Sequence, residues 1–331
     1  MQPFDYVRAT SVADAMRAVE AAGPGTRLLA GGTTLYDLMK LGVETPDHVV
    51  DINGLRVLET IDTSQPGELA FGALARMSDV AADPVIMRDY PALSESLWRA
   101  ASQQLRNMAS VGGNLLQRTR CAYFRNGPPF ACNKRASGSG CAAKEGIDRG
   151  HALFGGSEAC IAVYPGDWAV ALVAFDAQLD VEGPRGPRSL PVEALHIPPG
   201  ATPDVETTLA PGEIIVRIRV PKTALGRAST YHKIRDRESY AFALVSVAAA
   251  LRMEGDTVAE ARLALGGVAT RPWRAREAEA TLVGRPFTPD TAREAGEAAF
   301  AGARPGRMNG FKVELGIRAV ADALSIARER N

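Results

Sequence analysis

All four cysteines of this 331-residue chain lie between positions 121 and 160, and they restrict how that stretch can fold. The segments between them hold ten, eight and eighteen residues, so the C-x-x-C pair of a zinc ribbon is absent. Their neighbours are rich in Arg, Asn, Pro and Gly, whereas unrelated buried thiols usually lie in apolar strands or helices. We therefore predict one metal or cluster site, with the ligands Cys121, Cys132, Cys141 and Cys160.

The residues around the cysteines leave the kind of metal open. Seven cations and two carboxylates occupy residues 118–150, and a 4Fe–4S core held by four thiolates carries about −2, which such basic surroundings offset. Zinc held by four thiolates carries a similar charge, and His151 could replace one cysteine as a zinc ligand. Two disulfides are a further alternative, although that framework is typical of small secreted proteins.

Composition offers no electrostatic attraction to nucleic acid or to an anionic membrane. Lys plus Arg and Asp plus Glu both number 38, so the net charge is zero. The N-terminal residues lack the apolar core of a signal peptide, and the longest apolar run, Ala241–Leu251, is too short to span a bilayer. We expect a cytoplasmic chain that binds neither nucleic acid nor membrane, unless a partner carries it to the periplasm.

Hydrophobic periodicity and breaker residues predict an α+β fold in three pieces. The first piece has a helix over 12–22, capped by Ser11 and ended by Gly23, a strand over 27–30, a helix over 34–41 and a strand over 48–52. The second has strands over 58–62, 68–73, 167–181 and 213–221, with helices over 77–88 and 92–104. After Pro221 come strands over 230–235, 242–253 and 258–268, then helices over 274–282, 288–301 and 311–328.

Two glycine loops are candidates for binding phosphate. Residues 28–35 (LLAGGTTL) and 108–115 (MASVGGNL) each place paired glycines and a hydroxyl beside apolar segments. Without a Cβ, a glycine backbone can turn its N–H groups toward an anion, and a following helix N-terminus adds a favourable dipole. Glycine pairs also mark ordinary turns. Neither loop is a Walker A or G-x-G-x-x-G motif, so the pair points to a diphosphate ligand outside the P-loop and Rossmann folds.

The order of the motifs resembles the FAD-binding subunit of the xanthine dehydrogenase family of molybdenum hydroxylases. AGGTTL, ASVGGNLL and GDWAVALVAFDA follow one another as in that family, and ARLALGGVATRPWRAREAEATLVG resembles its C-terminal domain. Most members lack the insert that residues 117–162 form here. This insert resembles the flavin subunit of bacterial heterotrimeric aldehyde oxidoreductases, in which QRTRC, CNKR, GSGC and SEAC hold a 4Fe–4S cluster.

The resemblance implies a fold and a division into domains. A two-lobed FAD-binding domain of the PCMH/VAO type would comprise lobe 1 at 1–57 and lobe 2 at 58–222, with the iron–sulfur insert at 117–162. A small C-terminal domain of one antiparallel sheet and helices would occupy 226–331.

The resemblance also implies roles for single residues. The two glycine loops would bind the FAD diphosphate, Asp167 would lie near the adenosine half, Ile215 would pack on the cofactor and Lys233 would approach the flavin ring. The predicted contacts are Leu29, Ala30, Gly31, Gly32, Thr33, Thr34, Leu35, Ser110, Val111, Gly112, Gly113, Asn114, Asp167, Ile215 and Lys233. By pattern alone, Asp167 is a helix cap, Ile215 a core residue and Lys233 part of the solvated face of a strand.

The function implied is electron transfer inside a larger enzyme. A large molybdenum-cofactor subunit would oxidise an aldehyde or a xanthine-type substrate, and a small 2Fe–2S subunit would pass the electrons to the FAD and the 4Fe–4S cluster held here. The flavin would then reduce a terminal acceptor. Two other functions stay open: a self-sufficient flavoenzyme on the same fold, and a zinc-stapled binding module without enzymatic activity.

Overall fold

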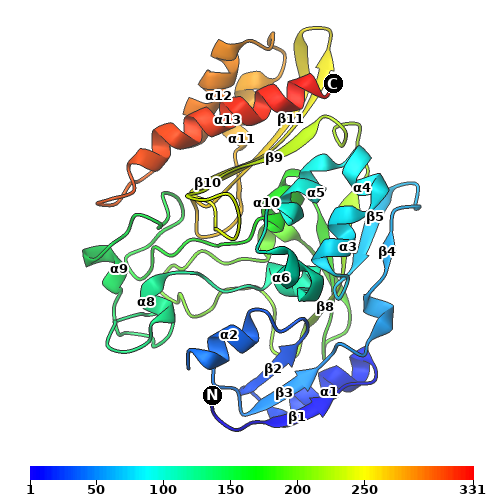
Figure 1. Ribbon diagram of the computed structural model, residues 1–331, viewed down its shortest axis with the longest axis vertical. Coiled ribbons are helices and arrows are strands. Elements are labelled where there is room, and N and C mark those ends of the chain that lie inside the picture. Colours follow the sequence, from blue (N-terminus) through cyan, green and yellow to red (C-terminus); the bar gives the residue numbers. More distant parts are fainter.

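Each of the three predicted pieces of the chain builds a β-sheet of its own. The computed structural model describes residues 1–331, and its sheets contain three, five and four strands in chain order. Figure 1 shows the three-stranded sheet at one end, the four-stranded sheet with its helices at the opposite end, and the five-stranded sheet between them. The mixed helix-and-sheet class predicted from the sequence is confirmed.

The N-terminal sheet is parallel and has the order β1-β3-β2. Its elements are β1 (Asp5–Arg8), α1 (Val12–Ala22), β2 (Thr26–Leu29), α2 (Leu35–Lys40) and β3 (His48–Asp51). The cap predicted for α1 is confirmed, because the Ser11 hydroxyl accepts a hydrogen bond from the Asp14 N–H at 3.0 Å. Strand β1 escapes sequence analysis because all four of its residues are exposed and show no alternation.

The five-stranded sheet is antiparallel and has the order β4-β5-β8-β6-β7. Its strands are β4 (Ile61–Asp62), β5 (Glu68–Gly72), β6 (Gln178–Glu182), β7 (Arg188–Pro191) and β8 (Ile214–Pro221). The helices of this piece are η1 (Arg56–Leu58), α3 (Met77–Ala82), α4 (Pro84–Asp89), α5 (Pro91–Trp98), α6 (Gln103–Met108), α7 (Val111–Leu115), α10 (Trp168–Ala174) and η2 (Val192–Ala194).

Three predictions about this piece were wrong. The helix expected over 92–104 ends at Trp98, and a separate helix, α6, begins at Gln103. Residues 168–174 form the helix α10 and not a strand, and all seven of its residues are buried. A short apolar run looks the same in a buried helix and in a buried strand, so periodicity could not decide between them. The single helix expected over 77–88 is broken at Asp83, whose carboxylate caps α4 by accepting hydrogen bonds from Val85 N–H and Ile86 N–H.

The C-terminal sheet is antiparallel and lies under three helices. Its order is β12-β11-β10-β9. The strands are β9 (Ser229–Ile234), β10 (Val245–Glu254), β11 (Thr257–Gly266) and β12 (Trp273–Arg274), and the helices are α11 (Arg276–Leu282), α12 (Pro289–Phe300) and α13 (Phe311–Glu329). Figure 1 shows α13 running along the sheet, and its buried residues join the same apolar core as those of β10 and β11. No helix in the chain is long and apolar enough to cross a bilayer.

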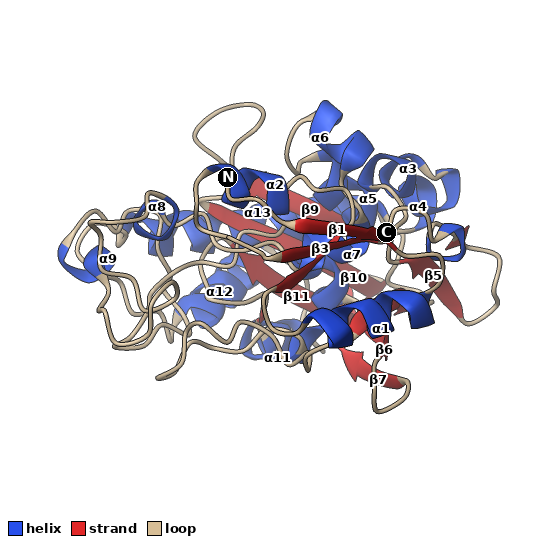
Figure 2. Ribbon diagram, turned by 90° about the horizontal axis from the view of Figure 1, so that it is seen from below, coloured by secondary structure: helices blue, strands red, loops and turns tan.

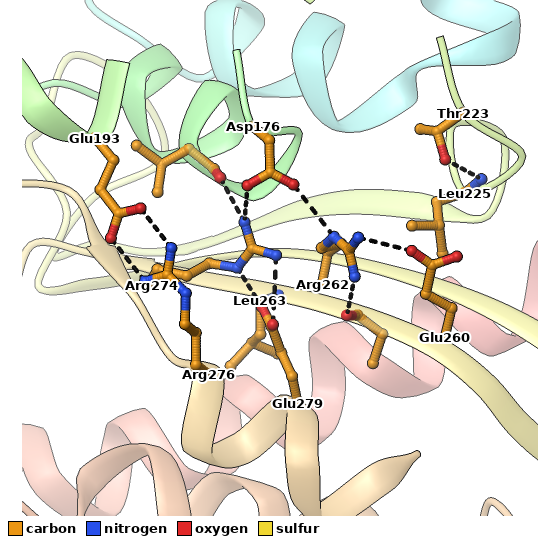
Figure 3. A network of polar contacts seen from close by, with 12 residues as sticks. Asp176, Glu193, Thr223, Leu225, Glu260, Arg262, Leu263, Arg274, Arg276 and Glu279 are labelled. Carbon is orange, nitrogen blue, oxygen red and sulfur yellow. Dashed lines mark hydrogen bonds and ion pairs between the residues drawn. The ribbon is translucent and has the colours of Figure 1, made fainter. Parts of the chain in front are cut away.

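A network of ion pairs joins the C-terminal piece to the five-stranded piece (Figure 3). Arg274 of β12 and Arg262 of β11 both reach Asp176, which follows α10, at 2.9 and 3.5 Å. Arg276 pairs with Glu193 at 2.6 Å. The side chain of Arg274 is almost fully buried, so loss of its partners would leave an unpaired buried charge. The two pieces are therefore fixed relative to each other.

The cysteine-containing insert lies outside all three sheets. Apart from the one-turn helices α8 (Ala122–Arg125) and α9 (Ala142–Glu145) it is irregular, and it extends from one side of the molecule in Figures 1 and 2. Arg120 and Arg125 attach it to α2, because both guanidinium groups reach Asp37, at 3.1 and 2.8 Å.

Candidate functional site

The first glycine loop presents a row of free backbone donors. The N–H groups of residues 31–35, between β2 and α2, donate to no acceptor within the protein. Gly32 has φ +72°, a conformation that favours glycine, and the loop residues are half-buried. Successive unpaired amides at the start of a helix form a concave donor surface that suits an anion.

The second glycine loop is built differently. Residues 111–115 form the short helix α7, in which Val111 N–H and Gly112 N–H donate to the carbonyls of Ala75 and Ala73, at 2.9 and 2.8 Å. Gly113 N–H donates to the Ser110 hydroxyl at 3.2 Å. Most of the amides are therefore used inside the protein. The sequence suggested two equivalent cradles, and the structure has one open row of donors and one capped helical turn.

The two loops are in direct contact. A Cβ on Gly31 would stand 2.0 Å from the carbonyl oxygen of Met108 and 2.9 Å from Cα of Ala109. Two side chains hold the junction together: Asn53 donates to the Ala30 carbonyl at 2.7 Å, and Arg76 donates to the Met108 carbonyl at 2.5 Å. Only glycine at position 31 permits this approach.

Asn53 and Arg76 also contact each other, with 3.3 Å between the Arg76 guanidinium and the Asn53 amide oxygen. The Asn53 amide further donates to Asp51 at 2.8 Å. Sequence reasoning missed both residues. The available signal for Asn53 was its position, with Gly54, immediately after the strand predicted over 48–52, since the ends of parallel strands commonly lie at ligand sites.

Asp167 and Lys233 form one buried ion pair. The Lys233 ammonium lies 2.9 Å from one Asp167 oxygen, and Tyr231 donates to the other at 2.7 Å. The Lys233 side chain is 0% exposed, so the expectation that it belongs to a solvated strand face was wrong. The expectation that Asp167 caps α10 was also wrong, because its carboxylate accepts no backbone N–H there. Burial raises the pKa of Asp167, and Lys233 opposes this shift.

This pairing limits what the two side chains can offer a ligand. The resemblance assigned Asp167 and Lys233 to opposite halves of the dinucleotide, whereas their charged groups touch. Lys233 also donates to the Arg99 carbonyl at 2.9 Å. Only the capacity left over from these contacts is free for a ligand: one of the three ammonium donors of Lys233 and the remaining lone pairs of the Asp167 carboxylate. Ile215, the other predicted contact in this piece, is 5% exposed in β8 and packs in the main core.

The four cysteines line one cavity. Cys121, Cys132, Cys141 and Cys160 all face it, together with His151, and it holds about 300 Å³ of space that is partly open to solvent. Cys132 and Cys141 are brought side by side by a backbone bridge. All four thiols are free, and no three Cys, His, Asp or Glu side chains lie close enough to share a single metal ion. Burial raises the pKa of Cys121 to about 11, so the thiol carries its proton at neutral pH and would release it on binding a metal ion or cluster.

Cations support the walls of this cysteine cavity. Arg135 donates to the carbonyls of Tyr123 and Phe124, at 2.8 and 2.9 Å, and so ties the second cysteine segment to the first. Lys134 lies on the cavity and pairs with Glu206 at 2.7 Å. The basic residues noted in the sequence are therefore structural braces as well as a source of positive charge.

Comparison with known proteins agrees with this architecture. Residues 2–223 match the family described as the FAD binding domain in molybdopterin dehydrogenase, and residues 229–325 match the CO dehydrogenase flavoprotein C-terminal domain. The chain is 47% identical, over 99% of both chains, to the aldehyde oxidoreductase FAD-binding subunit PaoB of Escherichia coli (strain K12). It is 28% identical to the carbon monoxide dehydrogenase medium chain of Hydrogenophaga pseudoflava, covering 91% of this chain and 88% of that one.

A solved structure extends the comparison to the fold. Carbon monoxide dehydrogenase from Hydrogenophaga pseudoflava superimposes with a TM-score of 0.78 at 28% identity, covering 100% of this chain and 99% of that chain. The predicted FAD-binding domain followed by a C-terminal antiparallel sheet domain is thereby confirmed. The chain therefore belongs to the family of FAD-binding medium subunits of the molybdenum hydroxylases, oxidoreductases that include carbon monoxide dehydrogenase, xanthine dehydrogenase and aldehyde oxidoreductase.

Proposed function

We propose that this chain is the FAD- and 4Fe–4S-binding electron-transfer subunit of a three-subunit, molybdenum-dependent aldehyde oxidoreductase. A large molybdenum-cofactor subunit oxidises the substrate, and a small 2Fe–2S subunit passes the electrons to this chain. The flavin then reduces a terminal acceptor. The 47% identity to an aldehyde oxidoreductase FAD-binding subunit favours an aldehyde over a xanthine-type substrate.

The observation that carries the FAD site is the row of unpaired amides at residues 31–35. Five N–H groups beside the start of α2 would hold the diphosphate, and Thr33 and Thr34 add two hydroxyl groups. Leu29, Ala30 and Leu35 complete this first contact region. Residues 110–114 would approach the same diphosphate from the other side, because the two loops are in contact at Gly31.

When bound, FAD supplies the hydride and electron chemistry, and the protein supplies binding and orientation. Asn53 and Arg76 hold the two glycine loops in contact, which fixes the distance between the two sides of the diphosphate site. Asp167, Lys233 and Ile215 would bound the cofactor from the five-stranded and C-terminal sheets. The domain division at 1–57, 58–222 and 226–331 goes with this assignment, because the first loop lies in lobe 1 and the second in lobe 2.

Two features of the cysteine cavity support a 4Fe–4S cluster. All four thiols reach one cavity, and they are spread more widely than one ion with sulfur ligands at about 2.3 Å would require. A 4Fe–4S cluster binds one thiolate at each of its four iron atoms, so its thiolates lie farther apart than the four ligands of a single ion. Cations on the insert offset the negative charge of such a group.

Metal and flavin analysis of the purified complex tests this function. Beyond the iron and sulfide of the 2Fe–2S subunit, we expect one FAD and about four iron and four sulfide per copy of this chain. A Cys132→Ser variant should lose the cluster and keep its FAD, and Ser137→Ala, a change at an exposed hydroxyl nearby, should keep both. A complex without FAD would overturn the whole assignment.

Stoichiometric zinc in place of iron would overturn the cluster assignment alone and would favour a structural zinc site. Oxidation of a small substrate by the isolated chain, without partner subunits, would favour the self-sufficient flavoenzyme.

A further inference from the structure

His151 lies in the cysteine cavity without being needed as a fifth ligand. It is 7% exposed, it lines the cavity, and its Nε2 atom is 3.3 Å from the sulfur of Cys121. The other ring nitrogen, Nδ1, is buried and has no partner. A thiolate bound to a metal carries no proton, so in a loaded site the contact with Cys121 can only be a hydrogen bond donated by His151.

The C-terminal piece holds the backbone from which the His151 imidazole extends. The backbone carbonyl of His151 accepts hydrogen bonds from the Asn309 amide at 3.2 Å and from the Lys312 ammonium at 3.3 Å. Asn309 is 1% exposed and Lys312 0% exposed. Asn309 lies in the segment between α12 and α13, and Lys312 lies in the first turn of α13. Two buried donors on one carbonyl leave His151 little freedom to move away from Cys121.

The same segment also binds Asp148, three residues before His151. The buried carboxylate of Asp148 accepts hydrogen bonds from Arg307 N–H and Met308 N–H, at 2.7 and 2.8 Å. The approach is so close that a Cβ on Gly306 would stand 2.1 Å from the Asp148 carboxylate. Residues 148–151 are thus fixed to the C-terminal piece at both ends.

Lys312 adds a positive charge behind His151. Its ammonium forms no ion pair and donates to two carbonyls, those of His151 and Gly267, at 3.3 and 2.9 Å. An ammonium buried without a counter-ion is costly. A group of about −2 held by four thiolates on the other side of His151 would supply the missing negative charge.

We propose that His151 tunes the four-cysteine centre as a positioning residue: it donates a hydrogen bond to the Cys121 sulfur and raises the reduction potential of the cluster, while Asn309 and Lys312 hold it in place. This inference rests on the proposed cluster. A donor to a ligand sulfur stabilises the form of the site that carries one more electron, because the sulfur is then more negative. This hydrogen bond requires no change in the charge of the imidazole.

The test is an EPR-monitored redox titration of the cluster in the intact complex. His151→Phe keeps a ring of similar size and removes the donor, so the cluster potential should move to a more negative value. The FAD potential and the iron content should stay as in the parent protein. His151→Gln retains an N–H donor and should recover most of the shift. Lys312→Met should also move the potential to a more negative value.

His48→Phe is the matched control, because His48 is a partly exposed histidine whose ring lies near Asp5 and far from the cysteine segment in sequence. It should leave the cluster potential unchanged. An unchanged potential in His151→Phe with four iron bound would overturn this inference and leave the cluster assignment intact. Strong ¹⁵N hyperfine coupling from His151 to iron would also overturn it, because His151 would then be a ligand. A parent protein without iron would overturn the cluster assignment itself.

Discussion

The two glycine loops look alike in the sequence and differ in their hydrogen bonds. In residues 31–35 the N–H groups have no acceptor, whereas in residues 111–114 the N–H groups of the short helix α7 donate to Ala73, Ala75 and Ser110. The first loop therefore has free donors for an anion, and the second loop supports the first as a rigid surface. A Gly-Gly pair next to an apolar segment is compatible with either role.

The difference arises from what packs behind each loop. The second loop lies against the residues after β5, where Gly112 approaches Ala73 so closely that a Cβ would stand 2.8 Å from the Ala73 Cβ. The carbonyls of that segment then satisfy the amides of the loop. Residues 31–35 contact the second loop at Gly31, but their N–H groups donate to none of its carbonyls, so only a ligand or water can pair with them.

Gly31→Ala should have the largest effect on this contrast. Its new methyl group would stand 2.0 Å from the Met108 carbonyl, a backbone atom that cannot move without displacing the second loop. We expect FAD affinity to fall about 100-fold or more, which corresponds to about 2.7 kcal/mol. Titration of FAD into the flavin-free complex measures this change.

Gly113→Ala is the control for that variant, because its Cβ would meet only the Ser110 hydroxyl, at 2.9 Å. It should weaken FAD binding much less. Equal losses in the two variants would show that the loops contribute alike and would remove the contrast.

Asn53→Ala should have an intermediate effect. The variant loses the hydrogen bond to the Ala30 carbonyl and the contact with Arg76, so the first loop is less firmly held against the second. We expect about a tenfold loss of FAD affinity, or about 1.4 kcal/mol. The same titration checks it. Asn126→Ala, at an exposed helix end in the insert, should bind FAD normally. Normal binding by Asn53→Ala would mean that the first loop keeps its shape unaided.

Ser110→Ala should affect stability more than FAD binding. Its hydroxyl caps α7 by accepting the Gly113 N–H, and loss of a cap costs about 1 kcal/mol. Ser102→Ala removes the equivalent cap of α6, where the hydroxyl accepts the Leu105 N–H at 3.3 Å, and gives the reference for stability loss away from the loops. Denaturant unfolding with and without FAD separates the two effects. A tenfold loss of affinity confined to Ser110→Ala would show direct contact with the ligand.

Acid should weaken the support of the second loop, and this change should have the smallest effect of the series on FAD binding at neutral pH. Neutral His196 donates to the Leu115 carbonyl at the end of α7, at 2.9 Å, and burial lowers the pKa of His196 to about 4. The unfolded chain binds this proton near pH 6.5, so the stability contributed by neutral His196 is present above pH 6.5. It is lost as the pH falls toward 4, by about 3 kcal/mol at most.

The free energy of unfolding, measured between pH 7 and pH 4, checks this prediction. His196→Gln should reduce the loss of stability relative to the parent protein over that range. An identical pH dependence in both proteins would mean that His196 is not the group responsible.

The sequence was a good guide to local structure and a poor guide to the contacts that side chains make with distant parts of the chain. Helix α1 was predicted with its cap at Ser11, and three of the four strands after residue 226 were predicted to within a few residues, since both depend on nearby side chains and on periodicity. The short strand β12 was missed. Helix α10 was misassigned because seven consecutive buried residues carry no periodic signal. Asn53 and Arg76 were missed because their role depends on a contact between two loops that are more than seventy residues apart in the sequence.

By itself, the amino-acid sequence determined which chemical groups this protein has and their order: glycines where the backbone must turn, and four thiols within one basic, irregular segment. Only the tertiary structure decided which amides remain unpaired, that Lys233 is buried against Asp167, and that His151 faces Cys121. The physical reason is that burial and hydrogen bonding depend on the atoms a group meets, and in this fold those atoms come from distant parts of the chain.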